Sequence, residues 1–320
     1  ACNYDDHLEK LGEADWVVEA VAENLEIKHK VYQNITPHLK SDVIISSNSS
    51  GLPVSEIGKA LPENLRKRFL LTHFFNPPRY LRLVELVQSA ADDKVLKILA
   101  SFLEHNLGKG VVYAKDTPNF IGNRIGVFAQ MLVLKLTVEM GFTVEEVDKL
   151  LGTIAGRPKS AMYRTLDIVG LDVGFNVAVN TYDNCPDDEE RDLIKSTDIL
   201  DRLVEMGRLG QKTGEGFYKK TDEGILSLDF KTFKYTPQKR VRFDGYRLAK
   251  QYSSTPQKIR ALAYSDDKAG KFFWEALART LIYTANRIPE IADDIINIDH
   301  AMKWGYAWEL GPFETWDAIG

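Results

Sequence analysis

The chain has 320 residues, of which 44% are hydrophobic and 27% charged, with a formal net charge of −5. This balance is typical of a globular protein of two or three domains. The sequence has no basic block, which argues against nucleic-acid binding, and no apolar run of ~20 residues, which argues against membrane insertion. Two cysteines, Cys2 and Cys185, without metal-ligand spacing, predict no disulfide framework, no metal site and a reducing compartment such as the cytoplasm.

The first 115 residues alternate between strand-like and helix-like segments. Mostly apolar runs predict strands at residues 16–22, 43–47, 69–75, 83–87 and 110–114. Amphipathic spacing predicts helices at residues 25–40, 54–61 and 93–106. This alternation favours an α/β sheet whose first strands are parallel.

After residue 116 the pattern becomes helical. Thr117-Pro118 is a typical helix start, and helical periodicity continues from residue 119 to about 208. Within this stretch Thr143 and Glu146 have the spacing of a capping box. Further along, the sequence predicts a glycine-rich loop at 210–216, a linker or a poorly packed arm at 219–260, and helices at 272–286 and 290–305.

A weak internal repeat links the two helical regions. The first copy runs from Val147-Asp148 to Leu166-Asp-Ile-Val-Gly170, and the second from Ile298-Asp299 to Trp316-Asp-Ala-Ile-Gly320. A chance match between helical segments is an open alternative. The shared Leu/Trp-Asp-x-x-Gly ending favours a duplicated helical unit instead.

His73 and Glu85 are the first candidates for chemistry. His73 lies near the carboxyl end of an apolar strand, where ligands of α/β sheets bind. Glu85 lies inside the next strand, and a carboxylate near His73 would orient the ring, fix its tautomer and stabilise the imidazolium. On spacing alone, a core histidine and a strand-edge carboxylate explain the pattern at least as well.

Two further segments supply polar groups. Ser46–Ser50 ends the second predicted strand and offers hydroxyl and amide donors at a carboxyl end. Asn119–Arg124 opens the first helix of the next domain, where Gly122 permits close approach and Asn123 would face the sheet. The alternatives are helix capping for the serines and ordinary helix polarity for Asn123.

Six short motifs follow one another between residues 19 and 218. They are Glu19-Ala-Val-Ala-Glu-Asn24, Ser47-Asn-Ser-Ser50, His73-Phe-Phe-Asn-Pro77, Leu83-Val-Glu85, Lys115-Asp-Thr-Pro118 with Phe120-Ile-Gly-Asn-Arg124, and Gly210-Gln-Lys-Thr-Gly-Glu-Gly-Phe-Tyr218. In this order they resemble the signature motifs of the L-3-hydroxyacyl-CoA dehydrogenase family. Each motif alone is weak evidence, whereas six in family order are specific.

The resemblance implies roles at the substrate. His73 would be the base that takes the 3-hydroxyl proton of a 3-hydroxyacyl-CoA, and Glu85 would hold and polarise it. Ser50 and Asn123 would hydrogen-bond the oxygen functions of the substrate. Histidine suits this task because its ordinary pKa lies near neutrality.

The resemblance also implies NAD as cofactor. Glu23 and Lys28 would line its nicotinamide-ribose side, Asn76 would lie near the nicotinamide, and Lys212 would be a further contact. The hydride chemistry would belong to the cofactor. The fold implied is an incomplete Rossmann-like dinucleotide-binding sheet followed by all-α dehydrogenase C-terminal domains, duplicated.

The sequence departs from the family pattern in two places. No Gly-x-Gly-x-x-Gly motif occurs, and the acidic residue that would follow it is missing as well. We therefore expect a partial sequence that lacks the first βαβ half and binds NAD poorly by itself. In the first helical region Gly156-Arg-Pro-Lys replaces the usual Gly-Pro-Phe-Glu, which the second copy keeps at Gly311-Pro-Phe-Glu314.

These inferences predict a domain order. A partial NAD-binding domain would span residues 1–116, a first helical domain 117–220, a linker 221–263, and a second helical domain 264–320 that is cut short. Two helical domains indicate a multifunctional β-oxidation protein, in which an enoyl-CoA hydratase domain would follow. The expected partners are an acyl-CoA substrate and either a second copy of the chain in a homodimer or a thiolase in a β-oxidation complex. The alternative functions are a stand-alone 3-hydroxybutyryl-CoA dehydrogenase and a non-catalytic scaffold.

Overall fold

A computed structural model describes residues 2–320, so Ala1, where the first predicted domain begins, lies outside the described residues. The chain divides into two compact units. The sheet unit consists of the residues up to Gly122 together with Arg287–Tyr306, and the helical unit consists of Asn123–Asn286 together with Ala307–Gly320. Each unit is built from segments that are distant in the sequence.

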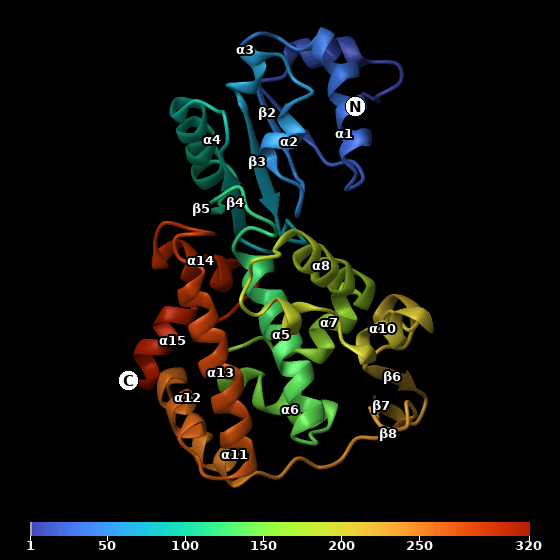
Figure 1. Ribbon diagram of the computed structural model, residues 1–320, viewed down its shortest axis with the longest axis vertical. Coiled ribbons are helices and arrows are strands. Elements are labelled where there is room, and N and C mark those ends of the chain that lie inside the picture. Colours follow the sequence, from blue (N-terminus) through green and yellow to red (C-terminus); the bar gives the residue numbers. More distant parts are fainter. Residues whose placement is uncertain (1) are drawn as a thin grey trace. The chain divides into compact units, whose positions relative to one another are not determined.

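A five-stranded sheet forms the centre of the sheet unit (Figure 1). Its strands, in spatial and chain order, are β1 (Trp16–Glu19), β2 (Ile44–Ser47), β3 (Phe69–Phe74), β4 (Leu83–Val87) and β5 (Gly110–Ala114). The first three are parallel, β4 runs antiparallel to β3, and β5 is parallel to β4. The predicted α/β sheet with parallel first strands is confirmed.

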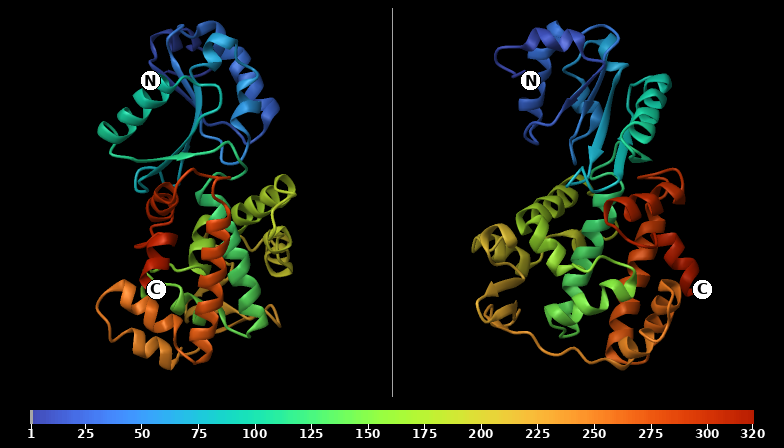
Figure 2. Two further views of the ribbon diagram at one scale, coloured as in Figure 1. Left: turned by 60° about the vertical axis from the view of Figure 1, so that its left-hand side comes forward. Right: turned by 180° about the vertical axis from the view of Figure 1, so that it is seen from behind.

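Helices lie on both sides of this sheet (Figure 2). On one side α4 (Asp93–His105) contributes Val95 and Leu99 to a core with Val84 and Leu86. On the other side Tyr32 of α1 (Leu25–Ile35) meets Phe69 edge to face. The remaining short elements before β5 are η1 (Leu8–Glu13), η2 (Thr36–His38), α2 (Val54–Gly58) and α3 (Glu63–Arg66).

The segment that contains α14 (Ile295–Gly305) completes the sheet unit from the far end of the chain. The backbone N–H of Tyr113 in β5 donates to Asn297 Oδ1 at 2.8 Å, and the N–H of Lys115 donates to the Ile291 carbonyl at 3.0 Å. Trp304 lies so close to Gly110 that a Cβ there would sit 2.3 Å from its ring. The predicted second helical domain at 264–320 is therefore divided, because part of it covers β5.

The helical unit has one core that joins both predicted helical regions. Phe128 of α5 (Gly122–Glu139) stacks on Tyr283 of α13 (Lys268–Asn286) with ring centroids 3.8 Å apart. The other helices are α6 (Val144–Leu150), η3 (Thr153–Ala155), α7 (Tyr163–Val169), α8 (Leu171–Asn184), α9 (Arg191–Ile194), α10 (Asp198–Glu205), η4 (Gln211–Thr213) and α15 (Pro312–Ile319). Glu146 accepts the Thr143 N–H at 2.9 Å, as the capping-box spacing predicts.

Residues 221–263 are mostly folded, so the predicted linker is wrong for most of its length. They contain β7 (Gly224–Leu228) and β8 (Tyr235–Pro237), which form an antiparallel sheet with β6 (Tyr218–Thr221), and then α11 (Asp244–Ala249) and α12 (Thr255–Ala263). Residues 238–243, between β8 and α11, form an extended connection without helix or strand (Figure 1). The prediction failed because few side chains of this region, such as Leu228 and Ile259, are buried among many exposed charges.

Two carboxylates cross-link the helical unit. Asp148 accepts the N–H groups of Met162, Tyr163 and Arg164 at 2.7–3.1 Å and the Tyr218 hydroxyl at 2.9 Å. Asp167 accepts the N–H groups of residues 217 and 218, both at 2.8 Å. Burial raises the pKa of each carboxyl to about 6, although these hydrogen bonds act in the opposite direction.

Two features are absent from residues 2–320. None of their helices combines the length and the apolar character that crossing a membrane requires. The same residues include no group of three or more His, Cys, Asp or Glu side chains arranged to hold a metal ion.

Candidate active site at the carboxyl edge of the sheet

His73 and Glu85 lie directly opposite each other on the antiparallel strands β3 and β4. Side chains in such a pair share one face of the sheet with their Cβ atoms roughly 5 Å apart, which lets them meet. His73 Nδ1 is 2.6 Å from Glu85 Oε2, and only 4% of His73 and none of Glu85 is exposed. The structure thus brings the two predicted residues into a hydrogen bond.

The second oxygen of Glu85 is held by the backbone. Glu85 Oε1 accepts the N–H groups of Ile121 at 3.1 Å and Gly122 at 2.8 Å. The chain reaches this position through Asn119 and Phe120, whose φ angles of 63° and 50° lie in the left-handed region. Such conformations cost about 1–3 kcal/mol each and are typical of functional sites. Both carboxylate oxygens are therefore fixed, and with them the ring of His73.

Two aromatic side chains pack against the His73 ring. The centroid of Phe75 is 4.7 Å from that of His73, and the centroid of Phe120 is 5.7 Å from it. The sequence reasoning did not single out either residue, although both stand inside the matched motifs. With Nδ1 turned to Glu85, the nitrogen that can exchange a proton with a ligand is Nε2.

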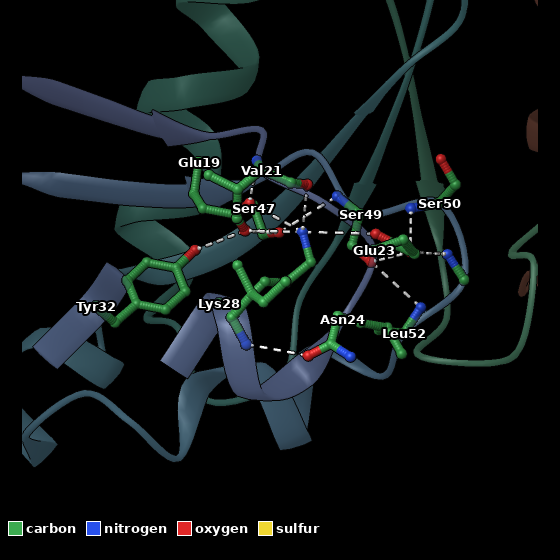
Figure 3. Close-up of polar contacts among 12 residues, drawn as sticks. Glu19, Val21, Glu23, Asn24, Lys28, Tyr32, Ser47, Ser49, Ser50 and Leu52 are labelled. Carbon is green, nitrogen blue, oxygen red and sulfur yellow. Dashed lines mark hydrogen bonds and ion pairs between the residues drawn. The ribbon is translucent and has the colours of Figure 1, made fainter. Parts of the chain in front are cut away.

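A buried ion pair joins the last residue of β1 to α1 (Figure 3). Lys28 Nζ lies 2.9 Å from Glu19 Oε1, and both side chains are 1% exposed. Glu19 also accepts the Ser47 hydroxyl at 2.6 Å, the Val21 N–H at 2.6 Å and the Tyr32 hydroxyl at 3.4 Å. These contacts offset the cost of burying the charges. Glu19 was not predicted, and its place at the head of the first motif was the available signal.

Glu23 lies beside this pair, with Lys28 Nζ 3.5 Å from its Oε2. Its Oε1 accepts the Ser49 hydroxyl at 2.5 Å and the N–H groups of Ser50 and Gly51 at 2.9 and 3.0 Å. Burial favours a higher pKa for Glu23, but the Ser49 hydrogen bond, the Lys28 charge and the two N–H groups outweigh it and lower the pKa. The Ser50 hydroxyl points away from Glu23 (Figure 3).

The loop after β2 joins these groups to the strand of His73. Asn48 Oδ1 accepts the Phe74 N–H at 3.0 Å, one residue beyond His73. Asn76, two residues further on, is exposed at the end of the same strand. The carboxyl ends of β1, β2 and β3 therefore present Glu23, Ser50, His73 and Asn76 along one edge, where ligands of α/β sheets bind.

Two predicted site residues belong to the helical unit. Asn123 is the second residue of α5 and is half-buried. Lys212, in η4, makes an ion pair with Asp172 in which the nitrogen and oxygen are 2.5 Å apart. The structure thus groups His73 with Glu85, and Glu23 with Lys28 and Ser50, whereas Asn123 and Lys212 lie outside the unit that contains these groups.

The residues present fit one half of a dinucleotide. Glu23 is 43% exposed and offers an acceptor for the hydroxyl groups of a ribose, whereas Lys28 is only 1% exposed and pairs with Glu19 and Glu23. No glycine-rich turn follows β1: residues 20–24 read Ala-Val-Ala-Glu-Asn, which offers no cradle for a pyrophosphate. The described residues therefore offer a carboxylate acceptor for a ribose but no turn for a pyrophosphate.

Comparisons with known proteins agree with this geometry. The family profile for the NAD binding domain of 3-hydroxyacyl-CoA dehydrogenase matches residues 1–117, and the profile for its C-terminal domain matches residues 120–220. A "Probable 3-hydroxyacyl-CoA dehydrogenase" of Bacillus subtilis is 46% identical over 99% of this chain and 40% of its own length. A "Putative fatty acid oxidation complex trifunctional enzyme" of Rickettsia felis is 33% identical over 98% of this chain and 43% of its own length.

One solved structure extends the comparison. The crystal structure of FadB2 from M. tuberculosis is 30% identical, with a TM-score of 0.62, and covers 67% of this chain and 73% of that one. The chain spans less than half the length of the two curated relatives described above. Given the two profile matches and these relatives, the chain belongs to the 3-hydroxyacyl-CoA dehydrogenase family.

Proposed function

We propose that the chain carries out the oxidation of (S)-3-hydroxyacyl-CoA to 3-oxoacyl-CoA with NAD in fatty-acid β-oxidation. The observation that carries the proposal is the buried His73–Glu85 pair at the carboxyl edge of the sheet. An alcohol can lose hydride only if its hydroxyl proton is removed, and a histidine held by a carboxylate is suited to that step. Family membership supports the same reaction.

In this mechanism His73 Nε2 accepts the 3-hydroxyl proton of the substrate. Glu85 keeps the Nδ1 proton in place and stabilises the imidazolium that forms. NAD, when bound, supplies the acceptor for the hydride that leaves C3. In the reverse direction His73 returns the proton to the oxygen of the 3-oxo group. Phe75 and Phe120 limit access of water to the ring during both steps.

The remaining predicted residues take supporting roles in this proposal. Ser50 and Asn123 hydrogen-bond the oxygen functions of the substrate. Glu23 and Lys28 contact the nicotinamide ribose, and Asn76 lies near the nicotinamide ring. For Ser50, support comes from its hydroxyl, which points away from Glu23 (Figure 3). Lys212 is the weakest of the cofactor contacts, because Asp172 already binds its ammonium group.

The proposal is tested by His73→Gln in the complete polypeptide that carries this sequence. We expect acetoacetyl-CoA-dependent oxidation of NADH to fall by about 10²–10⁴-fold, because a general base contributes that much. The Kd for NADH, measured by fluorescence, should change little. Retained turnover would overturn the assignment of His73 as the base.

We further propose that this chain acts within a multifunctional β-oxidation protein. The match to a putative trifunctional enzyme over 98% of this chain supports this. Because no Gly-x-Gly-x-x-Gly occurs in the sequence, residues 1–320 alone should bind NADH weakly. Calorimetry that compares them with the complete polypeptide tests this, and equal affinities would contradict it.

The proposed duplication of the helical region has support in two helix ends. The Gly170 N–H donates to the Leu166 carbonyl at 2.8 Å, and the Gly320 N–H donates to the Trp316 carbonyl at 3.2 Å. Both glycines have left-handed φ angles, 108° and 94°. In a crystal structure the backbones of residues 147–170 and 298–320 should superpose helix on helix, and different helix directions would contradict the duplication.

A further inference from the structure

Tyr306 is the last residue of the C-terminal segment that returns to the sheet unit. It follows α14 directly and lies well outside residues 1–117 and 120–220, which the family profiles match. None of the six sequence motifs includes it. Its surroundings are nevertheless those of the His73–Glu85 pair.

A chain of aromatic contacts connects Tyr306 to His73. The Tyr306 ring meets the Phe75 ring edge to face, with centroids 5.9 Å apart, and Phe75 in turn lies 4.7 Å from His73. Gly305, just before Tyr306, packs tightly here as well: a Cβ at Gly305 would be 2.5 Å from a Leu83 methyl and 3.2 Å from the Phe75 ring. The end of α14 therefore packs tightly against Phe75 and leaves its ring little freedom to move.

A second route runs through Gly122 to Glu85. A Cβ at Gly122 would lie 2.7 Å from Phe75 Cζ and 3.5 Å from Tyr306 Cε2, so both rings rest against this glycine. The N–H of the same glycine donates to Glu85 Oε1 at 2.8 Å. Burial and the nearby Glu85 charge raise the pKa of Tyr306, which agrees with a neutral ring beside the carboxylate.

We propose that Tyr306 is a positioning residue for the dyad. Its ring fixes Phe75 against His73 and packs against Gly122, whose N–H holds Glu85. The segment after the two matched domains thereby forms part of the wall of the active site. This inference rests on the proposed function, because it assigns Tyr306 an effect on proton transfer by His73.

The test compares Tyr306→Ala and Tyr306→Phe in the complete polypeptide, with acetoacetyl-CoA and NADH as substrates. Tyr306→Ala removes the ring and should lower kcat by about tenfold, because small displacements of catalytic groups are costly, while KM for both substrates stays nearly unchanged. Tyr306→Phe keeps the ring contacts, so its kcat should stay close to that of the unchanged protein. The matched control is Trp304→Leu, since Trp304 lies in the last turn of α14, two residues before Tyr306, but contacts Gly110 and Arg82.

A double-mutant cycle separates positioning from general packing. In a Glu85→Gln background the dyad is already broken, so adding Tyr306→Ala should lower kcat little further. The proposal is overturned if Trp304→Leu lowers kcat as much as Tyr306→Ala, or if the Tyr306→Ala loss persists in full beside Glu85→Gln. If Tyr306→Ala does not fold by circular dichroism, Tyr306→Leu replaces it under the same criteria. Turnover retained by His73→Gln would instead contradict the proposed function itself.

Discussion

Glu85 in the sheet unit and Asp148 in the helical unit each accept several hydrogen bonds, but Glu85 is fully buried whereas Asp148 is half-buried, and their partners differ. Glu85 divides its oxygens between a histidine ring and two backbone N–H groups. Asp148 binds three backbone N–H groups and a tyrosine hydroxyl, none of which exchanges protons near neutral pH. The comparison suggests that a hydrogen-bonded carboxylate has a catalytic role when its partner can exchange a proton near neutral pH. When its partners cannot, its role is to hold segments of the fold together.

The largest expected effect that tests this comparison is that of Glu85→Gln. A glutamine that keeps its oxygen toward Ile121 and Gly122 turns its NH₂ group toward His73 Nδ1, which must then accept, so Nε2 carries the proton and cannot act as the base. We expect kcat to fall by about 10²–10⁴-fold with a small change in Tm. Steady-state kinetics and thermal unfolding of the complete polypeptide check both parts. A large loss of Tm with normal kcat would make Glu85 a cross-link like Asp148.

The reciprocal change, Asp148→Asn, should affect stability rather than turnover. The amide retains one acceptor oxygen, so some of the part-buried donors that Asp148 binds lose their partner. This loss costs about 1–3 kcal/mol of the free energy of unfolding. Urea unfolding measures this cost, and kcat at a temperature where the variant is folded should equal that of the unchanged protein. A kcat loss comparable to that of Glu85→Gln would remove the distinction between the two carboxylates.

The smallest expected effect is the pH dependence of the free energy of unfolding that Asp148→Asn removes. Since burial raises the pKa of Asp148 and Asp167 to about 6, above their unfolded values, their protonated forms stabilise the fold at low pH. That contribution is lost as pH rises through about 6. The destabilisation by Asp148→Asn should therefore be larger near pH ~5 than near pH ~7.5. The opposite order in urea unfolding would mean that the four hydrogen bonds to Asp148 outweigh its burial.

Much of the sheet unit was predictable because its strands are nearly continuous apolar runs. The His73–Glu85 contact depends in addition on the β3–β4 register, which a spacing of twelve residues does not determine, and the family resemblance supplied that information. Glu19 was missed because an acidic residue at a strand end has no distinguishing local pattern. Tyr306 was missed because its partners, Phe75 and Gly122, are far away in the sequence.

The helical unit was harder to predict beyond its individual helices. Periodicity identified the helices before residue 208 and after residue 269, but it carried no information about their shared core. Residues 221–263 were misjudged because short strands and helices with few buried side chains resemble a linker. The division of the C-terminal region between two units depends on contacts such as Asn297 with Tyr113, which only a three-dimensional structure reveals.

The return of residues 287–306 to β5 has a consequence for how the protein is made. During synthesis the strands of the sheet unit emerge first, but the groups that satisfy the β5 backbone and cover Gly110 leave the ribosome almost two hundred residues later. Until then β5 is a bare sheet edge, able to pair with other chains. A recombinant product ended after the second matched domain would keep that edge permanently and should aggregate.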